Sequence, residues 1–287
     1  MTINYVHTIV LPPTEDTSTI AQGSLFFVGT ATLLIRYAGF TILTDPNFLH
    51  LGELAHLGLR QRFARIANPA IDFAALPPFD LVLLSHLHED HFDRRVMRKL
   101  AKNMPIVTTP QAAHALAKKR FQILHALETW QTLSLVKGAG QLKITALPGK
   151  HAPGFLSAAF PPVMGSMLEF QVPDEKNAYR IYISGDTLIH RQMRQIPRRF
   201  PEIDLAILHL GSEKLYGIQT TMDGKQGIEA LKLINAKVTI PVHYNDYHCF
   251  TSSLEDFRLE VTKANLERRV RYLQRGYSYL FQMPDRG

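Results

Sequence analysis

Cysteine is almost missing from this chain: Cys249 is the only one in 287 residues, so no disulfide can form within the chain. Such sparing use of cysteine is typical of a reducing compartment. Long apolar runs are missing too, and none approaches the about 20 residues that a membrane-spanning helix needs. Residues Met1 to Tyr5 lack the basic segment and apolar core that open a signal peptide. Together these absences predict a cytoplasmic protein without a transmembrane segment.

The composition is otherwise that of an ordinary globular protein. Hydrophobic residues make up 46% of the chain, which is enough for a sizeable core. We expect a single domain over residues 1–287, because this length suits one large domain and no repeat or low-complexity segment divides it. Residues 1–21, with Pro12, Pro13 and several polar side chains, are expected to include an irregular N-terminal arm.

Basic residues outnumber acidic ones, with 32 Lys and Arg against 25 Asp and Glu, so the net charge is +7. This balance suits a small-molecule substrate that is anionic. The basic residues are spread over several segments with helical spacing, which is typical of solvated helix faces, and no DNA-binding module is recognisable. The sequence leaves the oligomeric state open.

The most informative stretch runs from Ser85 to His91 and reads Ser-His-Leu-His-Glu-Asp-His. It follows the apolar run Leu81 to Leu84, which predicts a buried strand, and it precedes a helical pattern that Asp93 is placed to cap. The histidines therefore lie on a loop, where side chains can turn towards a common point. Imidazoles and carboxylates are ligands that divalent metal ions prefer, although a polar surface loop is the alternative interpretation.

Matching side chains stand elsewhere in the chain. His151, Asp186 and His243 each come shortly after a strand-like apolar segment. A chance cluster of histidines would not require such partners, so we favour a metal site over a surface loop. The ligand types suit Zn²⁺ best, and Mn²⁺ or iron would also be compatible.

These residues carry a resemblance to a known family. The stretch His86-Leu87-His88-Glu89-Asp90-His91, with the three later ligands, resembles the metallo-β-lactamase superfamily, whose first motif is H-x-H-x-D-H. Segments 27–32 and 43–46 point to the branch that contains the ascorbate-6-phosphate lactonase-like proteins and N-acyl-phosphatidylethanolamine phospholipase D. The resemblance extends from about Gly23 to about Phe257.

The resemblance implies two divalent metal ions and a fold. One ion would be bound by His86, His88 and His151, the second by Asp90, His91 and His243, and Asp186 would bridge both. The implied fold is an αββα sandwich, in which two packed mixed β-sheets are flanked by helices. The order of apolar segments by itself indicates only a mixed α/β protein.

Two cations close together can lower the pKa of a bridging water until hydroxide forms near neutral pH, and can polarise a substrate oxygen. Asp90 would orient this hydroxide and then pass a proton to the leaving group. Asp45, just before Pro46, would hold a ligand histidine through its other N–H, or would simply be a turn residue. His209 ends the apolar run 205–208, so we expect it at the same edge as a donor to the substrate; the alternative is a core histidine.

Two irregular segments are candidates for the substrate wall. Residues 47–70 suggest either a short helix packed on the core or a lid, and the two interpretations are about equally supported. Residues 152–164 follow ligand His151 directly, so Phe155 and Phe160 are expected to line the substrate site. Tyr244 is chosen as a further lining residue from the several polar and aromatic side chains after His243.

The sequence therefore predicts a binuclear metal-dependent hydrolase that cleaves an ester or lactone bond. The apolar loops favour a substrate with an acyl or other hydrophobic part. A metal-dependent phosphodiesterase acting on a phospholipid, a small phosphodiester or RNA is the alternative on the same site. A non-catalytic metal-binding protein is a third class, and the complete ligand set counts against it.

Overall fold

Two seven-stranded mixed sheets form the centre of the part of the chain that this computed structural model describes, namely residues 4–12, 22–58, 61–172 and 177–282. The first sheet has, in spatial order, β18 (Ser278–Gln282), β2 (Gln22–Gly29), β3 (Thr32–Tyr37), β4 (Phe40–Thr44), β7 (Leu81–Leu83), β8 (Ile106–Thr108) and β9 (Leu124–Ala126). The second has β1 (Asn4–Leu11), β10 (Gln131–Lys137), β11 (Gly140–Pro148), β12 (Met164–Gln171), β13 (Tyr179–Ile183), β14 (Leu205–His209) and β17 (Val238–Val242).

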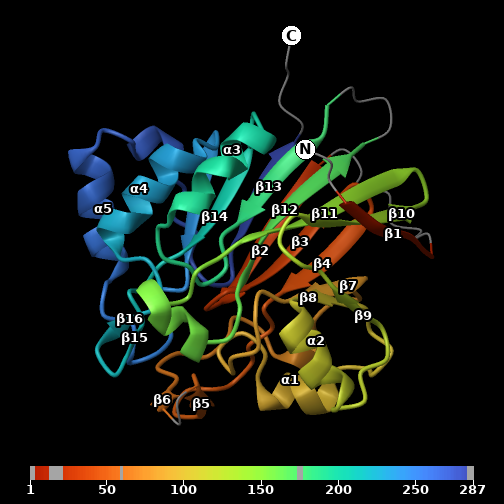
Figure 1. Ribbon diagram of the computed structural model, residues 1–287, viewed down its shortest axis with the longest axis horizontal. Helices are drawn as coiled ribbons and strands as arrows, with labels where there is room; N and C mark the ends of the chain where they lie inside the picture. Colours follow the sequence, from red (N-terminus) through yellow and green to blue (C-terminus); the bar gives the residue numbers. More distant parts are fainter. Residues whose placement is uncertain (1–3, 13–21, 59–60, 173–176, 283–287) are drawn as a thin grey trace.

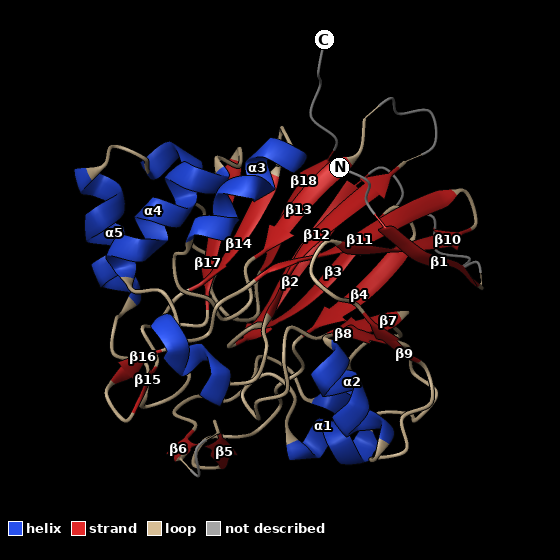
Figure 2. Ribbon diagram, in the orientation of Figure 1, coloured by secondary structure: helices blue, strands red, loops and turns tan. Residues whose placement is uncertain are grey.

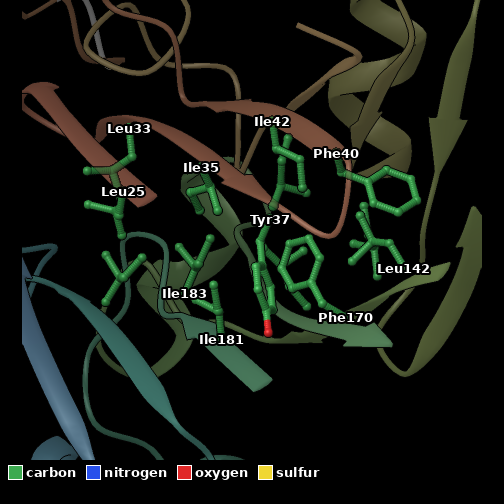
Figure 3. Close-up of a cluster of buried hydrophobic side chains, with 14 of the residues drawn as sticks. Leu25, Leu33, Ile35, Tyr37, Phe40, Ile42, Leu142, Phe170, Ile181 and Ile183 are labelled. Carbon is green, nitrogen blue, oxygen red and sulfur yellow. The ribbon is translucent and has the colours of Figure 1, made fainter. Parts of the chain in front are cut away.

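The two sheets pack face to face over a shared apolar core (Figure 3). Strand residues pointing inwards from the first sheet, such as Ile35 and Tyr37, meet Phe170 and Ile181 of the second. The ring of Tyr37 makes an edge contact with that of Phe170, at 5.5 Å between centroids. This alternation of inward and outward side chains is why the β-branched and aromatic runs form strands here rather than helices.

Helices cover the outer face of each sheet (Figures 1 and 2). On the first sheet, α1 (Arg94–Lys99) and α2 (Pro110–Ala117) bury Val96 and Leu116, and Asp93 caps α1 by accepting hydrogen bonds from two backbone N–H groups, as expected. On the second sheet lie η3 (Arg191–Gln195), α3 (Ile196–Arg199), α4 (Gly224–Ile234) and α5 (Leu254–Lys263), whose apolar faces form another buried cluster. The predicted αββα sandwich is confirmed. Three short 3-10 turns complete the helices: η1 (Phe73–Ala75), η2 (Gly154–Ala159) and η4 (Glu267–Arg269).

Three local features differ from the sequence-based expectations or were not foreseen. Within the expected irregular arm, residues 4–11 form β1, which pairs in parallel with β10; residues 13–21 lie outside the described part. The segment 47–70 holds a hairpin of β5 (Leu54–His56) and β6 (Arg62–Ala64) instead of a short helix. A second small hairpin joins β15 (Lys214–Leu215) to β16 (Ile218–Gln219).

Physical reasons explain these differences. Gly52 and Gly58 adopt φ values of +83° and +84°, which no α-helix accommodates, so they bend the segment 47–70 into a hairpin. β1 finds its partner more than a hundred residues away, which local patterns cannot reveal. None of the helices in the described ranges has the length and hydropathy of a membrane span.

Candidate active site

The candidate ligands lie at one edge of the sandwich because of strand direction. β4 and β7 run parallel in the first sheet, and β13, β14 and β17 run parallel in the second, so the loops that follow them leave at a common edge. Asp45 and the loop 84–91 follow strands of the first sheet. Asp186 and His243 follow strands of the second. The two edges meet, since His91 Nε2 lies 3.1 Å from Asp186 Oδ2.

The first group comprises His86, His88 and His151, whose ligand atoms all lie within 4.8 Å of one another. The Nδ1 atom of His88 is 3.0 Å from His86 Nε2 and 3.3 Å from His151 Nε2. Burial lowers the pKa of His86 well below its usual range, that of His88 to about 3, and that of His151 as well. These imidazoles are therefore neutral at physiological pH and keep the lone pairs that bind a metal ion.

The second group comprises Asp90, His91, Asp186 and His243, again within 4.8 Å. His243 Nε2 is 3.2 Å from Asp90 Oδ2 and 3.7 Å from Asp186 Oδ2. Asp186 Oδ2 also lies 4.0 Å from His86 Nε2 of the first group, so this one oxygen faces both groups. Asp186 therefore lies between the two groups, and the bridging role implied by the resemblance stays a prediction.

The second group differs from the first in the charge of its side chains. Burial alone would raise the pKa of Asp186, but the neighbouring His243 and His91 hold it well below its usual range. Burial would likewise lower the pKa of His91, yet Asp186, Asp90 and Asp45 raise it well above. The pKa of His243 is raised in the same way. Without a cation, these side chains therefore form charged pairs.

Each ligand histidine is held through its other ring nitrogen, except His88. Ser85 Oγ lies 3.0 Å from His86 Nδ1, and Asp45 Oδ2 lies 3.2 Å from His91 Nδ1. Asp45 Oδ1 in turn accepts a hydrogen bond from the backbone N–H of Ser85. Such contacts fix the ring orientation and raise the basicity of a ligand. The remaining two histidines use backbone carbonyl groups: His151 Nδ1 is 3.2 Å from Thr220 O, and His243 Nδ1 is 3.3 Å from Leu210 O.

Backbone conformation at the site is strained. Asp45 and His243 adopt left-handed φ values of +36° and +63°, a conformation that costs a non-glycine residue about 1–2 kcal/mol. His243 is kept there partly by its N–H, which donates to Thr30 O at 2.9 Å. Gly211 allows its own backbone to lie close to that of His243, because a Cβ at position 211 would lie only 2.4 Å from His243 O. Strain held by surrounding contacts is common at functional sites.

The donor set fits divalent metal ions. Among the described residues, Asp90 Oδ1, Asp186 Oδ1 and His88 Nε2 are buried and have no hydrogen-bond partner. Buried polar atoms are normally satisfied, so two adjacent carboxylates with spare oxygens indicate a site for cations. Imidazole nitrogens and carboxylate oxygens without a thiolate suit zinc, manganese or iron.

His209 lies beside Asp45, and its contacts differ from those expected of a substrate donor. It is fully buried, its Nδ1 is 3.1 Å from Ser184 Oγ, and its Nε2 is 3.7 Å from Asp45 Oδ2. Its ring stacks on that of His91 at 6.0 Å between centroids, and Asp45, His91 and His209 form a third compact cluster. These contacts favour a role in positioning His91, while a direct role towards substrate stays a prediction.

Side chains from four separate segments form an apolar cluster that contacts the candidate ligand His151, and we name it the covering cluster. Phe160 is almost fully buried there, and its ring lies 5.5 Å from that of His151. The side chain of Phe155 lies outside the described part. Tyr244 packs in the helix-side cluster, whereas Tyr247 belongs to the covering cluster. The buried members of the covering cluster are Leu49, Ala55, Leu57, Ala152, Phe160, Leu215, Tyr247 and Cys249.

The segment 47–70 is anchored over the site. Arg65 is fully buried, and its guanidinium pairs with Asp246 at 3.3 Å and donates to Asn47 O at 3.0 Å. A Cβ on Gly58 would lie 3.0 Å from His88 Nε2, so this backbone touches a candidate ligand. The described parts of the segment are therefore packed against the candidate site, as the packing interpretation expects, while a role as a lid or substrate-facing wall stays a prediction.

Glu213 lies near the candidate site, although the sequence analysis did not identify it as a site residue. It is fully buried, and neither carboxylate oxygen has a hydrogen-bond partner among the described residues. Its carboxyl group lies close enough to Asp90 and Asp186 for their charges to add to burial in raising its pKa well above the usual range. The only signal in the sequence is an acid soon after a strand that ends in a histidine, which is too common to predict a site.

Known proteins share the pattern and the fold. A family model described as the beta-lactamase superfamily domain matches residues 41–244. This chain belongs to the β-lactamase superfamily. The resemblance found in the motif is thereby confirmed at the level of the superfamily, while the narrower branch stays a prediction.

Individual superfamily members are distant in sequence. A UPF0173 metal-dependent hydrolase of Nanoarchaeum equitans is 25% identical over 204 residues, which cover 70% of this chain and 86% of that protein. The crystal structure of an isothiocyanate hydrolase from Delia radicum gut bacteria matches 90% of this chain and 99% of its own, with a TM-score of 0.75 and 21% identity. A possible metal-dependent hydrolase from Veillonella parvula matches 91% and 99%, with a TM-score of 0.73 and 19% identity. The two solved structures support the fold.

Proposed function

We propose that this protein hydrolyses an ester or lactone bond with two divalent cations, one at each group of ligands and with Asp186 shared between them. The chain is a metal-dependent hydrolase of the β-lactamase superfamily, as its family and its relatives indicate. The observation that carries the binuclear proposal is the position of Asp186 Oδ2, which is 3.1 Å from His91 Nε2 and 4.0 Å from His86 Nε2.

Two bound cations would supply an activated water and a Lewis acid for the substrate oxygen. Asp90 has one oxygen, Oδ2, directed at His243, while Oδ1 has no partner among the described residues. Oδ1 can therefore accept a hydrogen bond from the attacking water, orient it, and later carry a proton to the leaving group. Asp45 would hold the His91 ring through its contact with Nδ1, and the His209 ring, which stacks on that of His91, would help to position it.

Zinc suits the ligands best, with manganese and iron as alternatives. Covalent thiol catalysis is not part of the proposal. Cys249 is buried, and burial raises the pKa of its thiol far above the range in which a thiolate forms.

The covering cluster supports an acyl substrate. Its apolar side chains, including Phe160 against ligand His151, would contact a hydrophobic part next to the scissile bond. A phosphodiester substrate is the second candidate, because the net charge of +7 favours a phosphate.

A direct test combines metal analysis with a substrate screen. The purified protein, supplied with zinc, manganese or iron, should bind close to two ions and turn over a lactone or aryl ester faster than a bis-aryl phosphodiester or an aryl isothiocyanate; the last compound is included because of the solved isothiocyanate hydrolase. Asp90→Asn serves as the inactive control. At most one bound ion would contradict the binuclear site. Faster phosphodiester turnover would favour the second candidate, and no turnover of any substrate would favour a non-catalytic metal-binding protein.

A further inference from the structure

Glu213 is held rigidly beside the candidate metal centre. Its N–H donates to Thr221 Oγ1 at 2.8 Å, and its carbonyl oxygen accepts from Thr220 N at 2.9 Å and Thr220 Oγ1 at 3.1 Å. The backbone of Glu213 also forms an isolated antiparallel β-bridge with Phe250. The centroid of the Phe250 ring lies 4.4 Å from that of the His243 ring. Because Thr220 O in turn contacts His151, the same short segment supports Glu213 and a candidate ligand.

The carboxyl group of Glu213 is only partly compensated for its burial: His91 and the Thr220 side chain act to lower its pKa, but burial and two acidic neighbours outweigh them. Both oxygens are enclosed, and neither has a hydrogen-bond partner in the described ranges. Two of its charged neighbours, Asp90 and Asp186, are themselves acidic and disfavour a further negative charge. A buried carboxyl without a donor destabilises a fold, since its lost hydration is not replaced. A leucine or methionine of similar size would avoid this cost.

Neither packing nor metal binding explains this residue. Leu215, two residues along the chain, belongs to the mainly apolar covering cluster, against which a hydrocarbon side chain at position 213 could pack. The three groups of described residues that could hold a metal ion do not include Glu213. The cations proposed at the two ligand groups would offset part of the buried charge, but they would not supply hydrogen-bond donors to the carboxyl oxygens, which have none among the described residues. A donor on the substrate could fill that role, and polar groups kept at such a cost are typical of binding and catalytic sites.

We propose that Glu213 determines specificity by a hydrogen bond to a neutral hydroxyl or N–H group that the substrate carries next to its scissile ester or lactone bond. This inference rests on the proposed function. It refines the substrate class: the group that contacts Glu213 must be neutral, because an anionic group in direct contact with this buried carboxyl would be repelled. A hydroxyl or amide beside the bond would meet the free oxygens of Glu213, while the apolar part would contact the covering cluster.

The first experiment measures stability, with no substrate present. Glu213→Leu is compared with wild type as the metal-loaded protein, and Glu169→Leu is the matched control, because Glu169 is a strand carboxylate that does have a partner, Arg180, at 3.0 Å. We expect Glu213→Leu to raise Tm by about 2–4 °C, and the control to lower it or leave it unchanged. A lower Tm for Glu213→Leu would mean that the carboxyl supports the fold, and would overturn the proposal.

The second experiment measures preference among γ-butyrolactones that carry a hydroxyl, acetamido, methyl or carboxylate group next to the carbonyl. Wild type should prefer the hydroxyl and acetamido compounds over the methyl compound by about 10- to 100-fold in kcat/KM, and should turn over the carboxylate worst. Glu213→Leu should lose this preference without losing metal, and Glu213→Gln should keep part of it. Equal preference in wild type and Glu213→Leu would overturn the proposal.

Together, the stability and substrate-preference experiments distinguish a failure of this inference from a failure of the proposed function on which it rests. If wild type binds metal but turns over none of the lactones or esters, the proposed reaction is wrong, and the melting comparison alone then decides whether Glu213 is a functional acid. If lactones are hydrolysed and Glu213→Leu changes neither Tm nor preference, the reaction stands and the role of Glu213 is wrong.

Discussion

The two ligand groups share one sheet edge and similar spacing, but they differ in charge. The first group contains only imidazoles, and burial keeps all of them neutral. The second group contains two carboxylates, which raise the pKa of His91 and His243. A cation that binds the first group finds neutral imidazoles whose nitrogen lone pairs are free. A cation that binds the second group must first displace protons from His91 and His243. Comparison of the two ligand groups shows that burial and neighbouring charges can shift the pKa of histidines only a few ångströms apart in opposite directions.

Asp186→Ala should have the largest effect, because it removes the side chain of the second group that also faces the first. We expect metal content to fall below one ion per chain and kcat/KM to fall by about 1,000-fold or more, since a bound cation contributes several kcal/mol of charge stabilisation. Elemental analysis and steady-state kinetics measure this. Retention of two ions would place the shared ligand elsewhere.

Asp90→Asn tests the second group alone. The amide keeps the size of the side chain but cannot take a proton from water, so turnover should fall by about 100-fold or more while KM changes far less. The first group should retain its ion, which a metal assay would detect. Near-normal turnover would assign the orientation of water to another residue.

The pH dependence of metal binding should separate the groups. His91 has a pKa raised well above its usual value, so affinity at the second group should rise as pH increases through that raised pKa and protons leave. The pKa of His88 is about 3, so affinity at the first group should change little near neutral pH and fall only in acid. His243→Ala and His151→Ala isolate the first and second groups respectively.

Calorimetry in buffers of different ionisation enthalpy would count the protons released by these two variants. Proton release near pH 7 is expected for His151→Ala, which keeps the second group, and little or none for His243→Ala. Equal release from both would refute the contrast between the groups.

His209→Ala should have a smaller effect. If His209 positions His91, metal affinity should fall by about 10- to 100-fold, and turnover with it, as for other residues behind a ligand. His209→Gln should restore part of this, because its amide N–H group can also lie against the Asp45 carboxylate, which is 3.7 Å from His209 Nε2. A loss confined to turnover, with metal affinity unchanged, would instead support the direct substrate contact that we first expected.

Phe160→Ala should have the smallest effect on the chemistry. Both ions should remain, but the ranking of substrates by acyl size should change, because Phe160 lies against His151 within the covering cluster. Phe121→Ala, in the cluster behind the first sheet, is the matched control: it should lower Tm without changing the ranking. An unchanged ranking in Phe160→Ala would leave this residue as packing.

Most residues of the candidate metal centre could be predicted from the sequence because the signals that mark them are local. The spacing of His86, His88, Asp90 and His91 is set within one loop, and the apolar run before it predicts the strand that carries the loop. Asp93 was identifiable as a helix cap for the same reason. Later ligands such as Asp186 were recognisable because each follows a strand-like run.

Contacts between distant segments were decided by the tertiary structure. His91 and Asp186 are 95 positions apart, and only the meeting of two sheet edges brings them within 3.1 Å. The same contact between the two sheet edges brings His209, at the end of β14, close to Asp45, which follows β4. It also encloses Glu213 among acids and apolar loops, although nothing in its neighbouring residues marks it. The identity of the ligands was therefore determined by short-range chemistry and spacing, whereas the environment of each side chain, and hence its charge and role, depended on which strands and loops pack together.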